Sequence, residues 1–333
     1  MSTADIPSQP LAVLGAGAWG MALAQQAGAA GRPVRLWCRR PEQADLLARE
    51  RRDPAYLPEA PPLPASIAPT ADLLRAVEGA VALLLAVPTQ SLRGLARRLA
   101  PLLPAGVPLV ICCKGLELAT GELPGEILAE TLPGHPLLVL SGPSFAGELA
   151  RGRPTAVTLA AADPALAGRL AEALATPQFR PYLSDDPVGA QLGGALKNVV
   201  ALACGIVDGL GLGENARAAL VTRGLAEIVR LGRAKGARPE TFMGLSGLGD
   251  LTLSCAGPSS RNYAHGLAVG RGAPPPAKLA EGVATSAAAV ALARRLGIEL
   301  PIAEAVDAVV NRGDDLETTI RALLARPLRS ETA

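Results

Sequence analysis

Two lysines occur where a solvated surface lysine is not expected. Lys197, followed by Asn198, lies in residues 188–208, a run of almost entirely small and apolar residues that predicts a buried helix. Lys114 comes directly after residues 108–113, an apolar run that predicts a buried strand. Lysines are rarely buried without a partner or a function, and an ammonium group can bind an anionic substrate or exchange a proton with it. The alternatives are a Lys197 side chain that extends from a helix end to solvent and an ordinary loop lysine at 114.

Polar loops later in the chain could complete such a site. Asp250 is the one acid in the glycine-rich residues 244–251, and Ser260, Arg261 and Asn262 follow in a polar loop. Arginine and exposed backbone N–H groups are typical ligands of phosphate.

A third polar loop, with Gly142 and Ser144, follows the apolar residues 137–140. It predicts hydroxyl groups and open N–H groups at the same sheet edge as Lys114.

The two histidines are poor candidates for catalysis. His135 lies in a Gly-His-Pro turn, and His265 is predicted to open a helix. The chain has no G-x-S-x-G motif and no metal-ligand cluster. We therefore expect catalysis to use lysines, an acid and the backbone, with no metal.

A glycine motif near the N-terminus predicts the cofactor. Residues 11–14 form a short apolar run, Gly15, Gly17 and Gly20 follow with G-x-G-x-x-G spacing, and helix-forming residues come next. In dinucleotide-binding folds these glycines allow a tight turn, a close approach of the pyrophosphate and close helix packing, and the helix N-terminus binds the phosphates. The alternative is a glycine-rich turn without a ligand.

Arg39 and Arg40 follow the predicted second strand, residues 34–38. Folds that use NAD usually place an acid here to bind the ribose 2′-hydroxyl. Two guanidinium groups suit the 2′-phosphate instead, which favours NADP(H) while NAD(H) stays possible. A solvated surface pair is the other interpretation.

The periodicity of the chain predicts two domains. Apolar runs at 81–87, 108–113 and 137–140, and two further candidate strands at 156–160 and 179–182, indicate an α/β domain with a doubly wound, mostly parallel sheet. Residues 42–52 predict a helix, and the Pro-rich residues 54–69 predict a surface loop. The second half predicts helices only, at 188–208, 215–235, 264–270, 286–296, 302–311 and 316–325, with a connector at 209–213. We expect a Rossmann-type dinucleotide domain over 1–187 and an all-helical substrate domain over 188–333.

Composition limits the possible partners. The formal net charge of +2 gives no large basic field, which argues against nucleic acid. Five cysteines without a C-x-x-C pair favour reduced thiols and a cytoplasmic location. Residues 1–10 do not have the pattern of a signal peptide, and we expect no membrane span.

A series of motifs resembles the bacterial-type NAD(P)-dependent glycerol-3-phosphate dehydrogenases. It comprises GAGAWG at 15–20, AVPT at 86–89, KGLE at 114–117, LSGPSFA at 140–146, GGALKN at 193–198, GLGLGENARAALVTRG at 209–224, residues 244–262 and EGVAT at 281–285. The resemblance implies a cytoplasmic oxidoreductase that reduces dihydroxyacetone phosphate to sn-glycerol 3-phosphate for phospholipid synthesis. It also implies hydride transfer to C2, with Lys197 as proton donor and acceptor. The family often forms homodimers.

The resemblance also assigns residues to the site. Its catalytic lysine falls on Lys197, and we expect Lys114 to steady the substrate and Asp250 to orient Lys197. Cofactor contacts beyond the glycines would be Ala18, Trp19, Arg39, Arg40, Lys114, Ala146, Arg261, Leu279 and Glu281. Substrate contacts would be Lys114, Gly142, Ser144, Lys197, Asp250, Ser260, Arg261 and Asn262. Ala18 and Cys113 stand where many members have Ser, and both positions tolerate small residues.

Two other functions share parts of this pattern. A reductase of hydroxy acids or sugar acids could use the same two-domain plan, but it would not require the Ser260–Arg261–Asn262 loop. A dinucleotide sensor without catalytic activity would need only the first half of the chain, and the lysines and Asp250 would then have no role.

Overall fold

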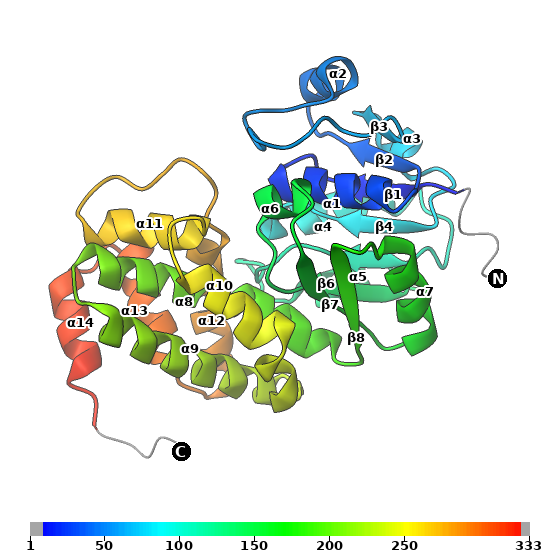
Figure 1. Cartoon of the computed structure of the whole chain (residues 1–333). Helices are drawn as coiled ribbons and strands as arrows, with labels where there is room; N and C mark the ends of the chain where they lie inside the picture. Colours follow the sequence, from blue (N-terminus) through cyan, green and yellow to red (C-terminus); the bar gives the residue numbers. More distant parts are fainter. Residues whose placement is uncertain (1–8, 328–333) are drawn as a thin grey trace.

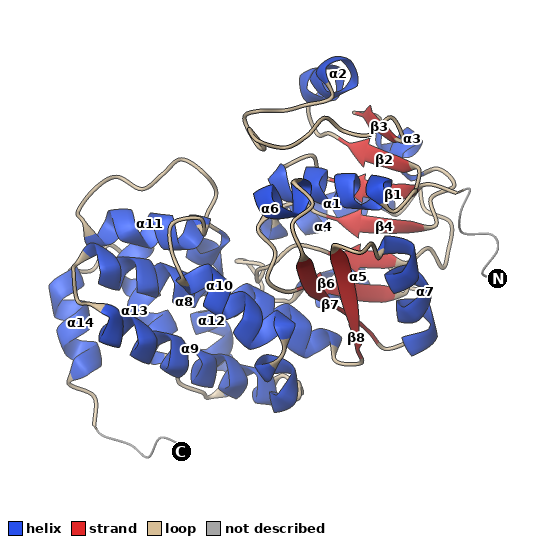
Figure 2. Ribbon diagram, viewed as in Figure 1, coloured by secondary structure: helices blue, strands red, loops and turns tan. Residues whose placement is uncertain are grey.

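A computed structural model describes residues 9–327 of the chain. The N-terminal part is one sheet covered by helices, and the C-terminal part is a bundle of helices beside it (Figure 1). The predicted pattern of residues 1–10 falls mostly outside the described residues. Figure 2 shows that, within residues 9–327, all strands belong to the first part and the elements from α8 onward are helices.

Eight strands form the sheet in the order β3-β2-β1-β4-β5-β6-β7-β8. All neighbours are parallel except β6 and β7, which are antiparallel. The strands are β1 Leu11–Leu14, β2 Val34–Trp37, β3 Ile67–Thr70, β4 Ala82–Leu85, β5 Leu109–Ile111, β6 Leu137–Ser141, β7 Thr155–Ala161 and β8 Phe179–Ser184. The expected mostly parallel α/β sheet is confirmed, but β3 overlaps the end of residues 54–69, which were predicted to be only a loop.

Each strand contributes side chains to two layers, as the two-residue period of a strand requires. Leu11 and Val13 pack with α1 (Ala18–Ala29), α2 (Pro41–Glu50), α6 (Ala146–Ala150) and α7 (Pro164–Leu174). Ala12 and Leu14 face the opposite layer, made by α3 (Leu73–Val77), α4 (Leu92–Leu99) and α5 (Pro124–Thr131). Because both faces are covered, the carboxyl ends of the strands remain as the edge where a site can form.

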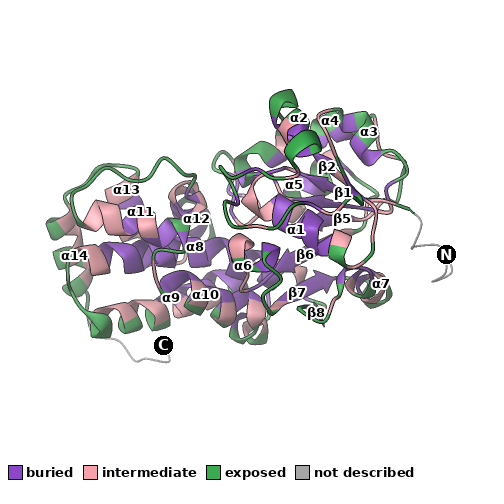
Figure 3. Ribbon diagram, turned by 45° about the horizontal axis from the view of Figure 1, so that its top comes forward, coloured by how far each residue is buried: buried purple, intermediate pink, exposed green. Residues whose placement is uncertain are grey.

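The helical part is organised around α8 (Pro187–Gly209), which is buried along most of its length (Figure 3). Asp186 caps this helix by accepting a hydrogen bond from the backbone N–H of Gly189 at 2.8 Å. Around it lie α9 (Glu214–Ala234), α10 (Asp250–Cys255), α11 (Arg261–Gly270), α12 (Glu281–Leu296) and α13 (Pro301–Val310), and α14 (Leu316–Leu324) packs on α13. Although α8 is long and apolar enough to cross a membrane, it is the core helix of this bundle.

Helix α11 lies unusually close to α8. A Cβ added at Gly205 would stand 2.1 Å from the carbonyl oxygen of Tyr263, and one at Gly266 would stand 2.1 Å from that of Leu202. The two backbones can approach only because both positions are glycine. This contact fixes the N-terminus of α11, with Ser260, against the middle of α8.

Some predicted boundaries differ from the structure. Helices α11 and α12 begin at Arg261 and Glu281, earlier than predicted, so His265 lies inside α11 and does not open it. The predicted glycine-rich turn at 244–251 is a π-helical turn, Leu245–Gly249, that runs directly into α10.

Candidate active site

The centre of the site is a buried carboxylate between two lysines. Asp250 begins α10 and has no exposed surface. Lys114 Nζ donates to its Oδ2 at 2.6 Å, and Lys197 Nζ donates a short hydrogen bond to its Oδ1. The three residues come from the end of β5, the middle of α8 and the start of α10, so both parts of the chain contribute.

Each ammonium has one further partner. Lys197 Nζ donates to the hydroxyl of Ser254 at 2.8 Å, and Lys114 Nζ donates to the carbonyl oxygen of Gly142 at 2.9 Å. The Ser144 hydroxyl donates to the same Gly142 carbonyl at 2.9 Å. The structure therefore brings together five of the predicted substrate contacts.

Burial determines the chemistry of Lys197. Its side chain is 10% exposed, and burial lowers the pKa of its ammonium from 10.5 to about 8. The nearby Asp250 carboxylate opposes this change in pKa, and the charge of Lys114 adds to it. A group with a pKa near neutrality can both give and take a proton at physiological pH.

A second set of hydrogen bonds links the site to the N-terminus of α11. Asn198 Nδ2 donates to the Lys114 carbonyl at 3.0 Å, and Asn262 Nδ2 donates to Asn198 Oδ1 at 2.8 Å. Asn262 Oδ1 accepts from the backbone N–H of Gly282 at 2.9 Å. The Asn262 side chain thus holds α8, α11 and α12 together. Beside it, Ser260 caps α11 by accepting the N–H of Tyr263 at 3.4 Å.

Exposed Arg261 is the first residue of the same helix. Because Ser260 already accepts the Tyr263 N–H, an anion at this helix end would meet the Arg261 guanidinium and the backbone N–H groups of Arg261 and Asn262.

The glycine turn has the geometry of a phosphate cradle. Gly15 has a φ of +113°, which favours glycine, and a Cβ at Gly20 would lie 1.7 Å from the Gly15 carbonyl oxygen. A Cβ at Gly17 would meet no atom within 4 Å, so the space above Gly17 is open. No side chain caps α1 at Gly17, and no acidic residue lies in its first turn. These residues fit a bound pyrophosphate.

Trp19 connects this cradle to the lysines. The Lys114 ammonium lies 5.9 Å from the centre of the Trp19 ring, and the indole N–H donates to the carbonyl oxygen of Cys112 at 3.1 Å. Half-buried Ala146 packs against the same core as α1. Glu281 Oε1 accepts the N–H of Thr89 at 3.2 Å, which joins α12 to the end of β4. Burial raises the pKa of the Glu281 carboxyl.

Three of the predicted cofactor contacts lie apart from the lysines. Arg39 and Arg40 are exposed directly after β2, which is the neighbour of β1 in the sheet. Neither makes an ion pair with another residue of the described chain. Leu279 is half exposed in the segment before α12.

Sequence reasoning gave no role to three polar residues here. Ser254 is the second partner of the Lys197 ammonium, after Asp250, and Asn198 links the Lys114 backbone to Asn262. Thr285 is fully buried, and its hydroxyl has no hydrogen-bond partner among residues 9–327. Ser254 and Thr285 each lie four residues after an acid of the site, Asp250 and Glu281. That helical spacing is the signal that could have identified them.

Comparison with known proteins agrees with this geometry. Residues 10–167 match the family model of the NAD-dependent glycerol-3-phosphate dehydrogenase N-terminus, and residues 186–321 match that of the C-terminus. The glycerol-3-phosphate dehydrogenase (NAD(P)+) of Rhodospirillum rubrum is 53% identical over 327 residues, covering 96% of this chain and 93% of the relative. A Bradyrhizobium enzyme of the same name is 54% identical, covering 97% of this chain and 98% of the relative.

Solved structures show the same relationship. The crystal structure of glycerol-3-phosphate dehydrogenase from Coxiella burnetii is 38% identical with a TM-score of 0.92, covering 96% of this chain and 99% of that one. The Saccharomyces cerevisiae enzyme is 26% identical with a TM-score of 0.81, covering 95% of this chain and 99% of that one. Neither a hydroxy-acid reductase nor a dinucleotide sensor accounts for matches over both halves at this identity. The chain belongs to the NAD(P)-dependent glycerol-3-phosphate dehydrogenases, the family that its motifs resemble.

Proposed function

We propose that the chain catalyses the reversible NAD(P)H-dependent reduction of dihydroxyacetone phosphate to sn-glycerol 3-phosphate, with Lys197 as the proton donor to the C2 oxygen. One observation carries the proposal: two lysine ammonium groups share the fully buried carboxylate of Asp250. A buried lysine with a lowered pKa, fixed by a carboxylate, has the properties of a general acid that becomes a base in the reverse direction.

The cofactor is held by the glycine turn and the first turn of α1. Gly15, Gly17 and Gly20 form the cradle, Ala18 and Trp19 supply backbone N–H groups of the first helical turn, and Ala146 and Glu281 would contact the cofactor as well. Arg39 and Arg40 bind the 2′-phosphate of NADP(H), and NAD(H) is the weaker alternative. Arg261 and Leu279 complete the contacts. The bound nicotinamide supplies the hydride.

The substrate lies between Lys114 and the N-terminus of α11. Lys114 holds the substrate oxygens, assisted by Gly142 and Ser144, and Asp250 keeps Lys197 directed at the C2 oxygen. Arg261, Ser260 and Asn262 bind the phosphate, with the N–H groups of the α11 first turn.

The wider role follows from this reaction. The product is the backbone precursor of glycerophospholipids, so the enzyme acts in lipid metabolism in the cytoplasm. Residues 1–187 form the dinucleotide domain and 188–333 the substrate domain. The Ala- and Leu-rich helical domain is also the part that would form a homodimer.

The proposal is tested by the absorbance of NADPH and, separately, NADH during reduction of dihydroxyacetone phosphate. Pyruvate and unphosphorylated dihydroxyacetone serve as control substrates, and we expect turnover with the phosphorylated ketone only. Lys197→Ala should lower kcat by about 10²- to 10⁴-fold and leave the Kd of NADPH within about twofold, because the lysine is not part of the glycine cradle. Lys235→Ala is the matched control, because Lys235, at the end of α9, also carries an ammonium paired with a carboxylate, that of Glu126. Near-normal kcat in Lys197→Ala would refute the assignment.

A further inference from the structure

The segment between β5 and α5, residues 112–123, carries Lys114 and contacts both parts of the molecule; we call it the Lys114 loop. On the helical side, Leu116 and Leu123 are buried in the same core as α8. The Lys114 carbonyl accepts from Asn198, and the carbonyl oxygen of Thr120 accepts from Arg295 Nη2 of α12 at 2.7 Å. The loop is therefore packed into the helical domain although it leaves the sheet.

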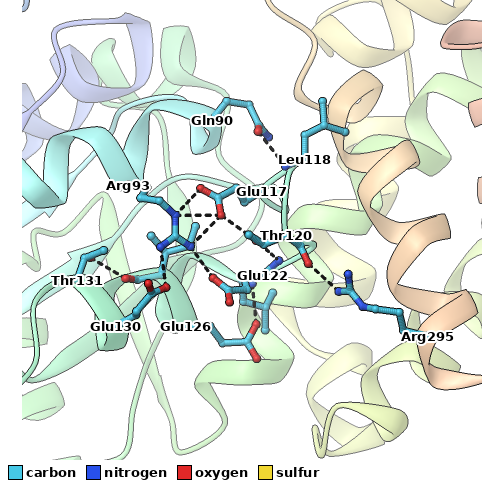
Figure 4. A network of polar contacts seen from close by, with 12 residues as sticks. Gln90, Arg93, Glu117, Leu118, Thr120, Glu122, Glu126, Glu130, Thr131 and Arg295 are labelled. Carbon is cyan, nitrogen blue, oxygen red and sulfur yellow. Dashed lines mark hydrogen bonds and ion pairs between the residues drawn. The ribbon is translucent and has the colours of Figure 1, made fainter.

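On the sheet side, α4 and the turn before it hold the loop by side chains (Figure 4). Gln90 donates to the Leu116 carbonyl at 2.8 Å and accepts the N–H of Leu118 at 2.9 Å. Arg93 binds Glu117 with two parallel hydrogen bonds, Nε to Oε1 and Nη2 to Oε2, both at 2.9 Å. Such a bidentate pair fixes orientation as well as distance.

The Arg93–Glu117 pair is more buried than the other contacts of this arginine. The side chains of Arg93 and Glu117 are 16% and 9% exposed, whereas Glu122 and Glu130, which also pair with Arg93 at 2.6 Å, are 36% and 60% exposed. The hydrogen bonds from Arg93 lower the pKa of the Glu117 carboxyl, and Thr120 donates to it as well. Without the guanidinium, Glu117 would remain an almost buried anion beside Glu122, and the two carboxylates would repel each other.

We propose that Arg93 and Glu117 form a positioning pair that holds the Lys114 loop on α4 and thereby keeps the Lys114 ammonium between Trp19 and Asp250. Glu117 lies three residues after Lys114, with the buried Gly115 and Leu116 between them. A displacement of Glu117 is therefore transmitted along a short, tightly packed backbone. The inference rests on the proposed role of Lys114 in substrate binding, and it assigns a positioning function in the reaction to two residues outside the proposed substrate and cofactor contacts.

The test uses Arg93→Ala and Glu117→Gln, each made in the parent enzyme and in a Lys114→Ala background. In the parent, each change should lower kcat/KM for dihydroxyacetone phosphate by about 10- to 100-fold, since a displacement of about 1 Å has effects of this size. The Kd of NADPH should change much less than kcat/KM, because the glycines of the cradle are not part of the Lys114 loop. In the Lys114→Ala background the same changes should have less than about a twofold effect, because the group they position is absent. Arg93→Lys, which keeps the charge but not the bidentate geometry, should recover part of the activity.

Glu130→Gln is the matched control, because it removes the exposed contact of Arg93 and leaves the Glu117 pair intact. A crystal structure of Arg93→Ala supplies a readout that does not depend on activity. The Lys114 Nζ to Asp250 Oδ2 distance, 2.6 Å in the parent, should exceed hydrogen-bond length in the variant.

A purely structural role would lower the unfolding temperature and leave both kcat/KM and this distance unchanged, which would overturn the inference. If Lys114→Ala is strongly impaired while Arg93→Ala in the parent is not, the inference fails and the proposed function stands. If Lys114→Ala keeps parental kcat/KM, the proposed role of Lys114 fails, and the inference fails with it.

Discussion

The replacement of Asp250 by Asn should shift the pH dependence of catalysis to lower pH. Lys197 has a pKa of about 8, so at pH 8 about half of the molecules carry the proton that the proposed reduction requires. Asp250 is the group that raises this pKa against the effects of burial and of Lys114. Asn keeps the shape of the side chain but removes its charge.

The magnitude follows from the contact. An opposite charge at hydrogen-bond distance changes a pKa by about 1 to 3 units, so Lys197 in Asp250→Asn should titrate between about pH 5 and 7. The protonated fraction at pH 8 would then fall by about 5- to 500-fold. In the oxidation direction the neutral amine is required, and its fraction at pH 7 should rise from about one tenth to at least one half.

The assay is kcat as a function of pH from about pH 6 to 10, in both directions. Lys114→Ala provides a comparison of opposite sign, because the charge of Lys114 lowers the pKa of Lys197 and its removal should move the profile to higher pH. Ser254→Ala removes an uncharged partner of Lys197 and should shift the profile least. Loss of orientation in any variant lowers the plateau of the profile without moving its midpoint. A parent midpoint near pH 10, or one unmoved in Asp250→Asn, would refute the assignment of Lys197.

Three further predictions concern the cofactor and the helical domain. Arg39→Ala and Arg40→Ala should each raise KM for NADPH by about 10- to 100-fold, because each removes a charge-assisted hydrogen bond to the 2′-phosphate. KM for NADH, which has no such phosphate, should change by less than about twofold. Equal changes of KM for the two cofactors in steady-state assays would mean that both arginines are surface charges. Gly17→Ala should keep the parental unfolding temperature and weaken NADPH binding, whereas Gly20→Ala should lower the unfolding temperature measured by calorimetry, because its Cβ would lie 1.7 Å from a carbonyl oxygen. Burial raises the pKa of Glu227 from 4.5 to about 7, although it accepts two N–H groups of α13. Between about pH 4.5 and 7 the Glu227 carboxyl is therefore protonated in the folded state and ionised in the unfolded state. Over this range the free energy of unfolding of the parent should fall by about 3 kcal/mol relative to that of Glu227→Gln. Urea titrations that give the same difference between parent and variant at every pH would contradict this.

Much of the fold follows from local patterns. The apolar runs predicted seven of the eight strands, and the small-residue run predicted the core helix α8. Strand β3 was missed because it lies in a Pro-rich stretch and contains Pro69. As the first strand of the sheet order it pairs on one side only, so it tolerates a proline that a central strand would not.

Glycines account for two of the wrong boundaries, the start of α12 and the turn before Asp250. Gly282, in the first turn of α12, lowers helix propensity, yet a Cβ there would stand 2.5 Å from the Asn198 carbonyl oxygen. Packing against α8 therefore requires glycine at position 282. The same glycine lowers the local helix propensity, so the sequence did not predict that the helix begins there. The glycines before Asp250 similarly suggested a turn, and without the helix at 250 the spacing of Ser254 could not be interpreted.

The proposed catalytic residues could be suspected from the sequence, but their contacts could not. Lys197 was conspicuous in its apolar run, and Lys114 was marked only by the end of a strand. Asp250 is 53 residues from Lys197 and 136 from Lys114. No local pattern encodes which of these groups meet. Lys197 and Asp250 meet because α10 packs on α8, and Lys114 joins them because the sheet part packs against the helical part.

The charge of the cluster explains why two lysines share one acid. Lys114, Lys197 and Asp250 together carry one excess positive charge, which a buried site of low dielectric constant disfavours. Release of the Lys197 proton leaves Lys114 and Asp250 as a neutral pair. Without Lys114, Lys197 and Asp250 would form an ion pair with no net charge, and Lys197 would keep its proton. Without Asp250, Lys197 would lose its proton before a substrate bound. The second lysine therefore sets the proton affinity between these limits. When negative charge develops on the substrate oxygen, transfer of the proton removes that charge and the excess positive charge together.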